Sequence, residues 1–273
     1  MHAMKDPIAT LPPVPRSYGM VNWLGFYTLL AKEVRRFLKV YFQTIMAPVV
    51  TTLLFLAVFA LALGRVAADV HGVPFVEFLA PGLIMMAMVQ NAFANTSSSL
   101  IIAKVQGNIV DMLMPPLSAT EQTLAVALGG VIRGVVVGLV VGLVMTLFVN
   151  VHVHDAFFIV FHAVMGSLLL SLLGMVGGIW ADKFDHMAAV TNFIVTPLSF
   201  LSGTFYTIDR LPEGFHAVAL ANPFFYMIDG FRYGFIGHAD GSLAVGLMVV
   251  GLADLALLAL TWRMLSTGYK LKA

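Results

Sequence analysis

Residues 125–149 read AVALGGVIRGVVVGLVVGLVMTLFV, and this stretch places strong limits on the fold of the chain. A helix needs about 20 mostly apolar residues to cross a bilayer, and this segment exceeds that length with Arg133 as its only charge. Glycine recurs at every fourth residue, at Gly130, Gly134, Gly138 and Gly142. Small residues at this spacing let membrane helices approach closely. The stretch therefore predicts a membrane-spanning helix that packs tightly against its neighbours.

The composition of the whole chain points the same way. Of 273 residues, 60% are hydrophobic and only 11% are charged, whereas a soluble domain carries about 25% charged residues. The formal net charge of +1 gives no reason to expect a nucleic-acid partner. Cysteine is absent from the sequence, which excludes disulfides and thiol catalysis. We expect an all-α integral membrane protein whose solvent is the lipid bilayer.

Six segments are long and apolar enough to span a membrane. Apart from Arg133 and Asp254 they contain no charged residue; they cover residues 44–64, 78–96, 125–149, 156–181, 187–208 and 242–262. Backbone polar groups cannot remain unpaired in lipid, and strand alternation is absent, so these segments are predicted to be helices. Together they define a membrane domain of residues 42–267.

The positive charges predict the orientation of these spans. With both termini in the cytoplasm, eleven of the 15 Lys and Arg residues fall on the cytoplasmic side, three fall outside and Arg133 lies within a span. Cytoplasmic loops of membrane proteins are enriched in Lys and Arg. Residues 1–20 are polar and proline-rich and lack the apolar core of a signal peptide. They are predicted to form a disordered cytoplasmic tail.

Residues 21–41 are predicted to form an amphipathic helix before the first span. Apolar and aromatic side chains from Trp23 to Tyr41 recur at helical spacing, and Lys32, Arg35, Arg36 and Lys39 fall on the opposite arc. Such a helix lies in the membrane interface. Its role is either membrane anchoring or contact with a cytoplasmic partner.

A second amphipathic segment follows the second span on the cytoplasmic side. Ala103–Met114 can form a short helix, which Pro115 and Pro116 must end because proline donates no backbone N–H. Ile102, Val105, Ile109 and Met112 fall on roughly one face, and Lys104, Asn108 and Asp111 on another. The segment is suited either to transmit a push from a soluble partner or to rest on the membrane as a linker.

Residues 209–241 are predicted to form an outer re-entrant helical hairpin. Two helical pieces fit between its glycines and prolines, Pro212–Leu220 and Pro223–Phe235, and Asn222 followed by Pro223 is a typical helix start. Its aromatic residues are expected at the membrane interface. Asp229 and Arg232 share a helix face and can pair. We interpret Asn222, Pro223, Asp229 and Arg232 as parts of an outer gate.

The intramembrane charges are candidates for function because burying them in lipid is costly. Arg133 and Asp254 both lie near mid-depth, and we hypothesise that they pair, directly or through water, either to hold helices together or as a gate or proton site. His162 is expected to bond to a neighbouring helix, and Pro197 to bend the fifth span. Motifs for a phosphate-binding loop, a metalloprotease or a nucleophile elbow are absent, so neither catalytic residues nor metal ligands are predicted.

Several long stretches resemble the ABC-2 type permeases, the membrane subunits of ATP-binding cassette exporters, and most closely a bacterial inner-membrane branch of them. The stretches are AKEVRRFLKVYFQTIMAPVVTTLLF, FLAPGLIMMAMVQNAFANTSSSL, AKVQGNIVDMLMPPLSATE, GGVIRGVVVG, FDHMAAVTNFIVTPLSFLSGTFYTIDRLP and NPFFYMIDGFRYGFIG. The resemblance extends from about Trp23 to Leu265.

The resemblance implies a transporter subunit that is not itself an enzyme. Two copies would join two cytoplasmic ATPase subunits, which bind ATP and Mg on separate chains. The family's coupling helix corresponds to Ala103–Leu113. The implied ATPase contacts are Glu33, Arg35, Arg36, Ala103, Lys104, Gln106, Gly107, Asn108 and Asp111. The implied substrate pathway contains Thr44, Pro48, Thr52, Gln90, Asn91, Asn95, Asn192, Thr196 and Ser199.

The cargo is left open at this point. A glycoconjugate remains a candidate, and the methionines of the second span, Met85, Met86 and Met88, suit lipid-like, amphipathic or drug-like cargo. The alternative function is an ion-coupled secondary transporter that uses Arg133 and Asp254. The missing internal repeat counts against this alternative, and the missing nucleophile or metal constellation counts against an integral membrane enzyme.

Overall fold

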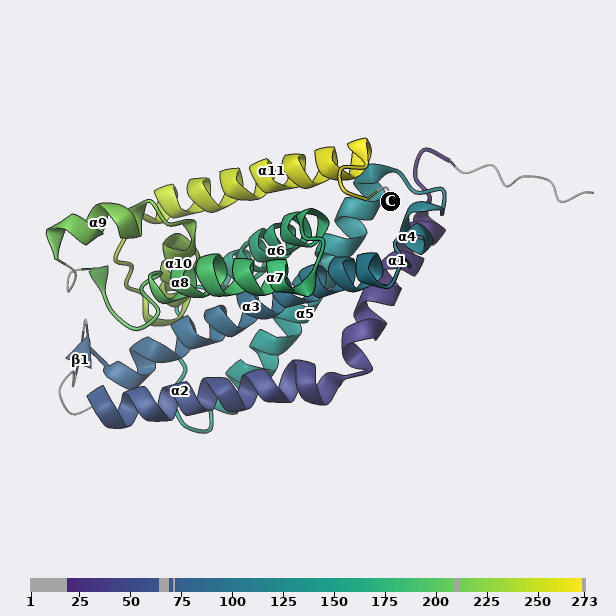
Figure 1. The fold of residues 1–273 in the computed structure, drawn as a ribbon. Helices are drawn as coiled ribbons and strands as arrows, with labels where there is room; N and C mark the ends of the chain where they lie inside the picture. Colours follow the sequence, from purple (N-terminus) through teal and green to yellow (C-terminus); the bar gives the residue numbers. More distant parts are fainter. Residues whose placement is uncertain (1–18, 64–68, 71, 209–211, 272–273) are drawn as a thin grey trace, which may run out of the picture.

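The computed structural model describes residues 19–63, 69–70, 72–208 and 212–271. The predicted cytoplasmic tail lies outside the described residues except for Gly19 and Met20. The chain forms an elongated helical bundle (Figure 1). At one end lie the short strand β1 (Asp69–Val70) and helix α9 (Glu213–Leu220), and at the other lie α1 (Trp23–Leu38), α4 (Val110–Leu113) and the C-terminus.

Five helices of the described part are long and apolar enough to cross a membrane. The first combines a π-helical turn, η1 (Phe42–Met46), with α2 (Ala47–Leu63). The other four are α3 (Phe75–Val105), α5 (Ala119–Met145), α6 (Ala156–Trp180) and α11 (Leu243–Thr267). These helices confirm an all-α membrane architecture.

The predicted fifth span, residues 187–208, corresponds to a shorter, interrupted helix in the structure. It consists of α7 (Phe184–Val190), a second π-helical turn, η2 (Thr191–Val195), and α8 (Thr196–Phe200). Pro197 lies in the first turn of α8, where a missing N–H is tolerated, and the irregular turn comes just before it. The helix ends at Phe200 and a left-handed Gly203 follows, so a span that continues to Ile208 is not confirmed.

Helix α3 forms the centre of the bundle and packs on α5 and α6. The glycines of α5 explain how closely these helices approach. A methyl group at Gly134 would lie 2.9 Å from the carbonyl oxygen of Met88, and one at Gly130 would overlap the hydroxyl of Ser171. Gly142 is different, because its nearest neighbour, Ile84 Cδ1, would lie 3.8 Å away. The predicted glycine packing is confirmed in the N-terminal part of α5 and fades towards Gly142.

Helix α1 lies across the end of α5. A methyl group at Gly129 would lie 2.6 Å from Glu33 Cβ, so the two helices are in direct contact there. At the start of α5, Ser118 and Glu121 form a reciprocal capping box. Glu121 also accepts a hydrogen bond from the backbone N–H of Asn22, just before α1. Helix α1 is thus fixed to α5 just before its start, at Asn22, and again at Glu33.

The two predicted helical pieces within residues 209–241 are present as α9 and α10 (Pro223–Ile236). Asn222 caps α10 by accepting from the Phe224 N–H at 3.0 Å, and left-handed Gly237 ends the helix. However, Phe224, Phe225, Tyr226 and Phe231 are buried where α10 packs on α3, α6 and α11. The expectation that these aromatics mark the membrane interface is wrong, because they fill the protein core.

A small antiparallel hairpin, which the sequence pattern did not predict, precedes α3. Strands β1 and β2 (Val73–Pro74) pair Asp69 with Pro74 and Val70 with Val73. The turn contains Gly72 in the left-handed region, which favours glycine. This hairpin leads the chain from α2 into the start of α3.

Candidate transport site

Two grooves flank α3 at Gln90 and Asn91. The first, of about 370 Å³, lies between α3 and α2, and its lining includes Gln43, Pro48 and Thr52. The second, of about 450 Å³, lies between α3 and the α7–η2–α8 helix, and its lining includes Ser98, Thr191 and Thr196. Gln90 and Asn91 line both grooves. The polar side chains of α3 therefore form a ridge between two open, partly polar grooves.

In each groove, the wall opposite α3 contains a π-helical turn. Gln43 belongs to η1, and Thr191 and Val195 belong to η2. A π-helical turn disturbs the regular helical hydrogen bonds and is frequent at functional sites. The two irregular helices thus face each other across the ridge, which supports these grooves as the functional part of the bundle.

The structure separates the predicted pathway residues into two groups. Pro48, Thr52, Gln90, Asn91 and Thr196 line the grooves. The others, which do not line either groove, are Thr44, Asn95, Asn192 and Ser199. Asn192 is exposed, whereas the buried hydroxyls of Thr44 and Ser199 donate to the carbonyls of Phe37 (2.9 Å) and Val195 (2.7 Å).

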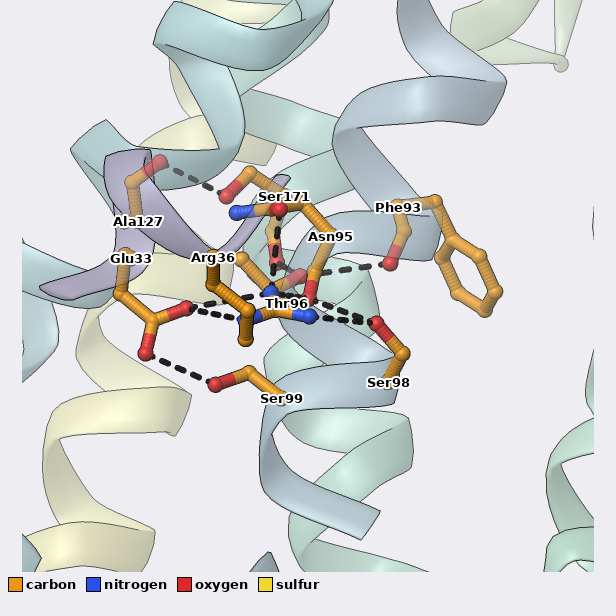
Figure 2. A network of polar contacts seen from close by, with 9 residues as sticks. All are labelled: Glu33, Arg36, Phe93, Asn95, Thr96, Ser98, Ser99, Ala127 and Ser171. Carbon is orange, nitrogen blue, oxygen red and sulfur yellow. Dashed lines mark hydrogen bonds and ion pairs between the residues drawn. The ribbon is translucent and has the colours of Figure 1, made fainter. Parts of the chain in front are cut away.

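Asn95 belongs to a polar network that joins α1 to α3 (Figure 2). Arg36 donates to the side-chain oxygen of Asn95 at 3.0 Å and to the hydroxyl of Ser98 at 3.1 Å. Glu33 accepts from Arg36 Nη2 at 3.1 Å and from the hydroxyl of Ser99 at 2.8 Å. The Glu33 side chain is 0% exposed, and that of Arg36 is 29% exposed. The network therefore holds an ion pair whose acid is buried and whose arginine is partly exposed.

The same end of α3 is also bonded to α6, and α6 to α5. Thr96 donates to the carbonyl oxygen of Ser171 at 2.6 Å, and Ser171 donates to that of Ala127 at 2.8 Å (Figure 2). Four helices are thus connected at one level of the bundle. We expect a displacement of α1 to be transmitted to the groove-forming helix α3, because these contacts are short and buried.

The predicted contact between Arg133 and Asp254 does not form. Arg133 donates instead to the side-chain oxygen of Asn91 at 2.9 Å. Asp254 is 3% exposed, and neither of its carboxylate oxygens has a hydrogen-bond partner among the described residues. His162 bonds to the Phe158 carbonyl of its own helix rather than to a neighbouring helix. A secondary transporter built on an Arg133–Asp254 pair therefore has no support in this geometry.

Residues 103–114, predicted to form one helix, are divided into separate elements in the structure. Ala103, Lys104 and Val105 end α3, Gly107 forms a left-handed turn, and α4 contains only Val110–Leu113 before Pro115 and Pro116. A glycine with positive φ interrupts the helix because the backbone leaves the right-handed region there. The segment is therefore a helix end, a turn and a single helical turn.

The predicted ATPase-contact residues differ in accessibility. Arg35, Gln106, Gly107, Asn108 and Asp111 are exposed, and Ala103 is half-buried. Glu33 and Arg36 are used inside the protein, as described above. Lys104 is also occupied, because its ammonium group donates to the carbonyls of Ile179 and Ala181 at the end of α6. In this structure only the exposed members are available to a cytoplasmic partner.

Asp182 connects the end of α6 to two lysines. Lys104 lies 3.4 Å from one carboxylate oxygen, and Lys270 donates to the other at 2.9 Å. The hydrogen bond from Lys270 is the main reason that the pKa of Asp182 lies below its ordinary value. The positive side chains also satisfy carbonyls at a helix C-terminus, where the macrodipole favours them. Lys104 thus links the exposed turn at Gly107 to the end of α6.

The predicted outer-gate residues have partners other than each other. Asp229 accepts from the backbone N–H groups of Asp240 (2.8 Å) and Gly241 (2.9 Å). Arg232 donates to the carbonyl of Gly203 at 2.6 Å, and its guanidinium lies 3.9 Å from the centre of the Phe78 ring. Burial raises the pKa of Asp229, while those N–H groups and the charge of Arg232 oppose the shift. The two side chains fasten α10 to loops on either side of it.

Sequence reasoning missed several residues of the site. Gln43, Ser98 and Thr191 line the grooves, yet no motif marks any of them in the sequence. One signal was available, because Asn91, Asn95 and Ser99 recur every fourth residue along α3 and therefore share a face. Within the described residues no group of three or more His, Asp or Glu side chains could hold a metal ion.

Comparison of the sequence with known proteins assigns this chain to a family. The model of the family described as "ABC-2 type transporter" matches residues 25–236. The chain is 36% identical over 251 residues to the inner membrane transport permease YadH of Escherichia coli K12, covering 92% of this chain and 98% of that protein. It is 24% identical over 259 residues to nodulation protein J of Rhizobium leguminosarum bv. viciae, covering 89% and 92%. This chain belongs to the ABC-2 type transporter family and is a transport permease with several membrane-spanning helices.

Proposed function

We propose that the chain is the membrane subunit of an ATP-driven exporter in the bacterial inner membrane. Two copies would form the pathway, with the interrupted α7–η2–α8 helix completing a sixth crossing in each copy. The observation that carries this proposal is the pair of partly polar grooves beside Gln90 and Asn91. Polar walls that face lipid are costly, so a second copy that covers them supplies the missing side of an enclosed path.

The helices that form the groove walls opposite α3 have exposed apolar side chains, which supports the proposal of a second copy. Helix α2 exposes Val50, Leu54 and Leu61, and η2 exposes Phe193 and Ile194. Apolar side chains on these helices can face either lipid or another copy of the chain. The grooves between the helices have partly polar walls, so they need a protein cover that keeps lipid away from them. A symmetric dimer would bring the α2 and η2–α8 flanks of the two copies together.

The cytoplasmic end offers a surface for a separate ATPase, which would bind ATP and Mg. The exposed turn of Gln106, Gly107 and Asn108 stands beside Asp111, and Arg35 is exposed on α1. We propose that the turn and α4 together take the place of a coupling helix. A movement of the turn would be transmitted towards α7 through Lys104 and Asp182. A movement of α1 would be transmitted to α3 through Glu33 and Arg36.

The opposite end suits control of exit. Helix α10 is buried between α3, α6 and α11, and Asp229 and Arg232 fasten it to the neighbouring loops. We propose that α9 and α10 form a re-entrant hairpin that acts as the outer gate. The names of the relatives do not specify a cargo for this chain; lipid-like, amphipathic, drug-like and glycoconjugate molecules suit grooves with mixed polar and apolar walls.

The proposal predicts that the chain forms a stable complex with an ATPase that carries a phosphate-binding loop. A candidate ATPase with such a loop is co-expressed with this chain, the complex is purified in lipid nanodiscs, and vanadate-sensitive ATP hydrolysis is measured. Replacing Gln106 and Asn108 with alanine removes exposed polar groups from the turn. We expect this double variant to lose at least tenfold in affinity for the ATPase while the permease remains folded.

The matched control replaces Asn150 and His152, which are exposed near the opposite end, with alanine. This variant should bind the ATPase as the parent does. Transport by the chain alone, driven by a proton gradient and insensitive to vanadate, would contradict the proposed function.

A further inference from the structure

Arg133 is a buried cation without a compensating acid. It lies near the middle of α5 and is 9% exposed. Among the described residues its only hydrogen bond is the one to Asn91 Oδ1, at 2.9 Å, and its Nε has no partner. This arrangement leaves a net positive charge at the depth of the bilayer core.

The other buried or half-buried cations of the bundle are balanced differently. Arg36 forms an ion pair with Glu33, and Lys104 lies near Asp182. Arg232 donates to backbone carbonyls and feels the charge of Asp229. Since each of these cations has an acid nearby, the missing acid at Arg133 is a specific property of this position.

Asn91 connects Arg133 to both grooves. Its side-chain oxygen accepts from Arg133, and one N–H of its amide donates to the carbonyl of Ala87 at 2.9 Å. The same side chain lines the groove towards α2 and the groove towards α7. The amide has a second N–H, and Gln90 supplies another amide beside it. An anion in either groove would thus meet amide donors with a positive charge directly behind them.

The charge of Arg133 acts over several ångströms because the surroundings have a low dielectric constant. A negative group in the groove would be attracted and would reduce the cost of burying the guanidinium, whereas a positive group would be repelled. The groove towards α2 also presents Phe55, Leu83 and Met86, which suit an apolar chain. The same groove thus offers a place for both parts of an amphiphile.

We propose that these grooves select amphiphilic cargo with an anionic head, and that Arg133 sets this preference through Asn91. The inference rests on the proposed function, since it concerns the cargo of that same pathway. It narrows the cargo to molecules that combine an apolar chain with a negatively charged group such as a phosphate or a carboxylate.

The test compares probes with the same tail and different heads. The purified permease is placed in nanodiscs of zwitterionic phosphatidylcholine, and equilibrium binding of radiolabelled dodecyl phosphate, dodecyl maltoside and dodecyltrimethylammonium is measured. We expect dodecyl phosphate to bind at least tenfold more tightly than dodecyl maltoside, and the cationic probe to bind most weakly. Arg133→Gln should remove the preference, and Arg133→Lys should keep most of it.

Two further variants make the result independent of a folding defect at Arg133. Asn91→Asp keeps the size of the side chain and places an acid beside the intact arginine, so it should also abolish the preference for the phosphate head. Arg263→Gln removes an exposed charge near the C-terminal end of α11, on a different helix from Arg133 and Asn91, and should leave the preference unchanged.

Three results would overturn the inference: equal binding of the anionic and neutral probes, no binding of any probe, or a preference that survives both Arg133→Gln and Asn91→Asp. The proposed function is tested separately by ATP hydrolysis in the assembled complex. A complex with vanadate-sensitive turnover but without a head-group preference would remove this inference and leave the transporter assignment intact.

Discussion

Replacing Glu33 with alanine is expected to destabilise the folded protein by about 3 kcal/mol, because it leaves the charge of Arg36 without its acid and the hydroxyl of Ser99 without its acceptor. Removing one member of a buried ion pair costs about 3–5 kcal/mol, and the partial exposure of Arg36 places the value at the lower end. The measurement is thermal unfolding in detergent, followed by the loss of the monodisperse peak in size-exclusion chromatography.

The neighbouring residues provide the controls for this experiment. Arg35→Ala removes an exposed charge from the same helix and should change stability little. The double variant Glu33→Ala with Arg36→Ala should be less destabilised than the sum of the single variants, since both charges are then absent. If Glu33→Ala unfolded at the same temperature as Arg35→Ala, the network would not join α1 to α3.

Replacing Gly130 with alanine is expected to cost about 1–3 kcal/mol, because the new methyl group would overlap the hydroxyl of Ser171. That hydroxyl donates to the carbonyl of Ala127, so a shift of Ser171 would also weaken the contact between α5 and α6. The free energy of unfolding is measured for alanine variants at Gly130, Gly138 and Gly142 under identical conditions.

The three positions should follow a definite order. Gly138→Ala meets the flexible side chain of Met88, which can move, so its cost should be smaller than that at Gly130. Gly142→Ala meets only Ile84 Cδ1 at 3.8 Å and should be neutral or slightly stabilising, since alanine favours a helix over glycine. Equal effects at all three positions would contradict the graded packing between α5 and its neighbours.

The sequence could predict the features that depend on local chemistry. Apolar length is sufficient to identify membrane helices such as 156–181, observed as Ala156–Trp180. The cap at Asn222 and the helix that follows Pro223 were also predicted, because capping involves only neighbouring residues. The close contact at Gly130 follows from its spacing, although the identity of its neighbour does not.

Features that depend on distant residues could not be predicted. Glu33 lies among basic residues, and its burial follows from the contacts with Ser99 and Gly129, which are far away in the sequence. The break at Gly107 was missed because helical spacing continues across it, while the backbone takes a left-handed turn there. A direct Arg133–Asp254 pair was wrong because Arg133 donates to Asn91 on α3 instead, although α5 and α11 are in contact.

The central claim is that the ridge of Gln90 and Asn91 faces a covered, hydrated pathway, and thiol labelling tests it most directly. The chain contains no cysteine, so a single cysteine can be introduced without background. Gln90→Cys and Leu252→Cys, the latter exposed on α11, are compared in the assembled complex in lipid, using a charged, membrane-impermeant methanethiosulfonate. The account predicts at least tenfold faster labelling at position 90 than at position 252, and labelling that is equally slow at both positions would contradict it.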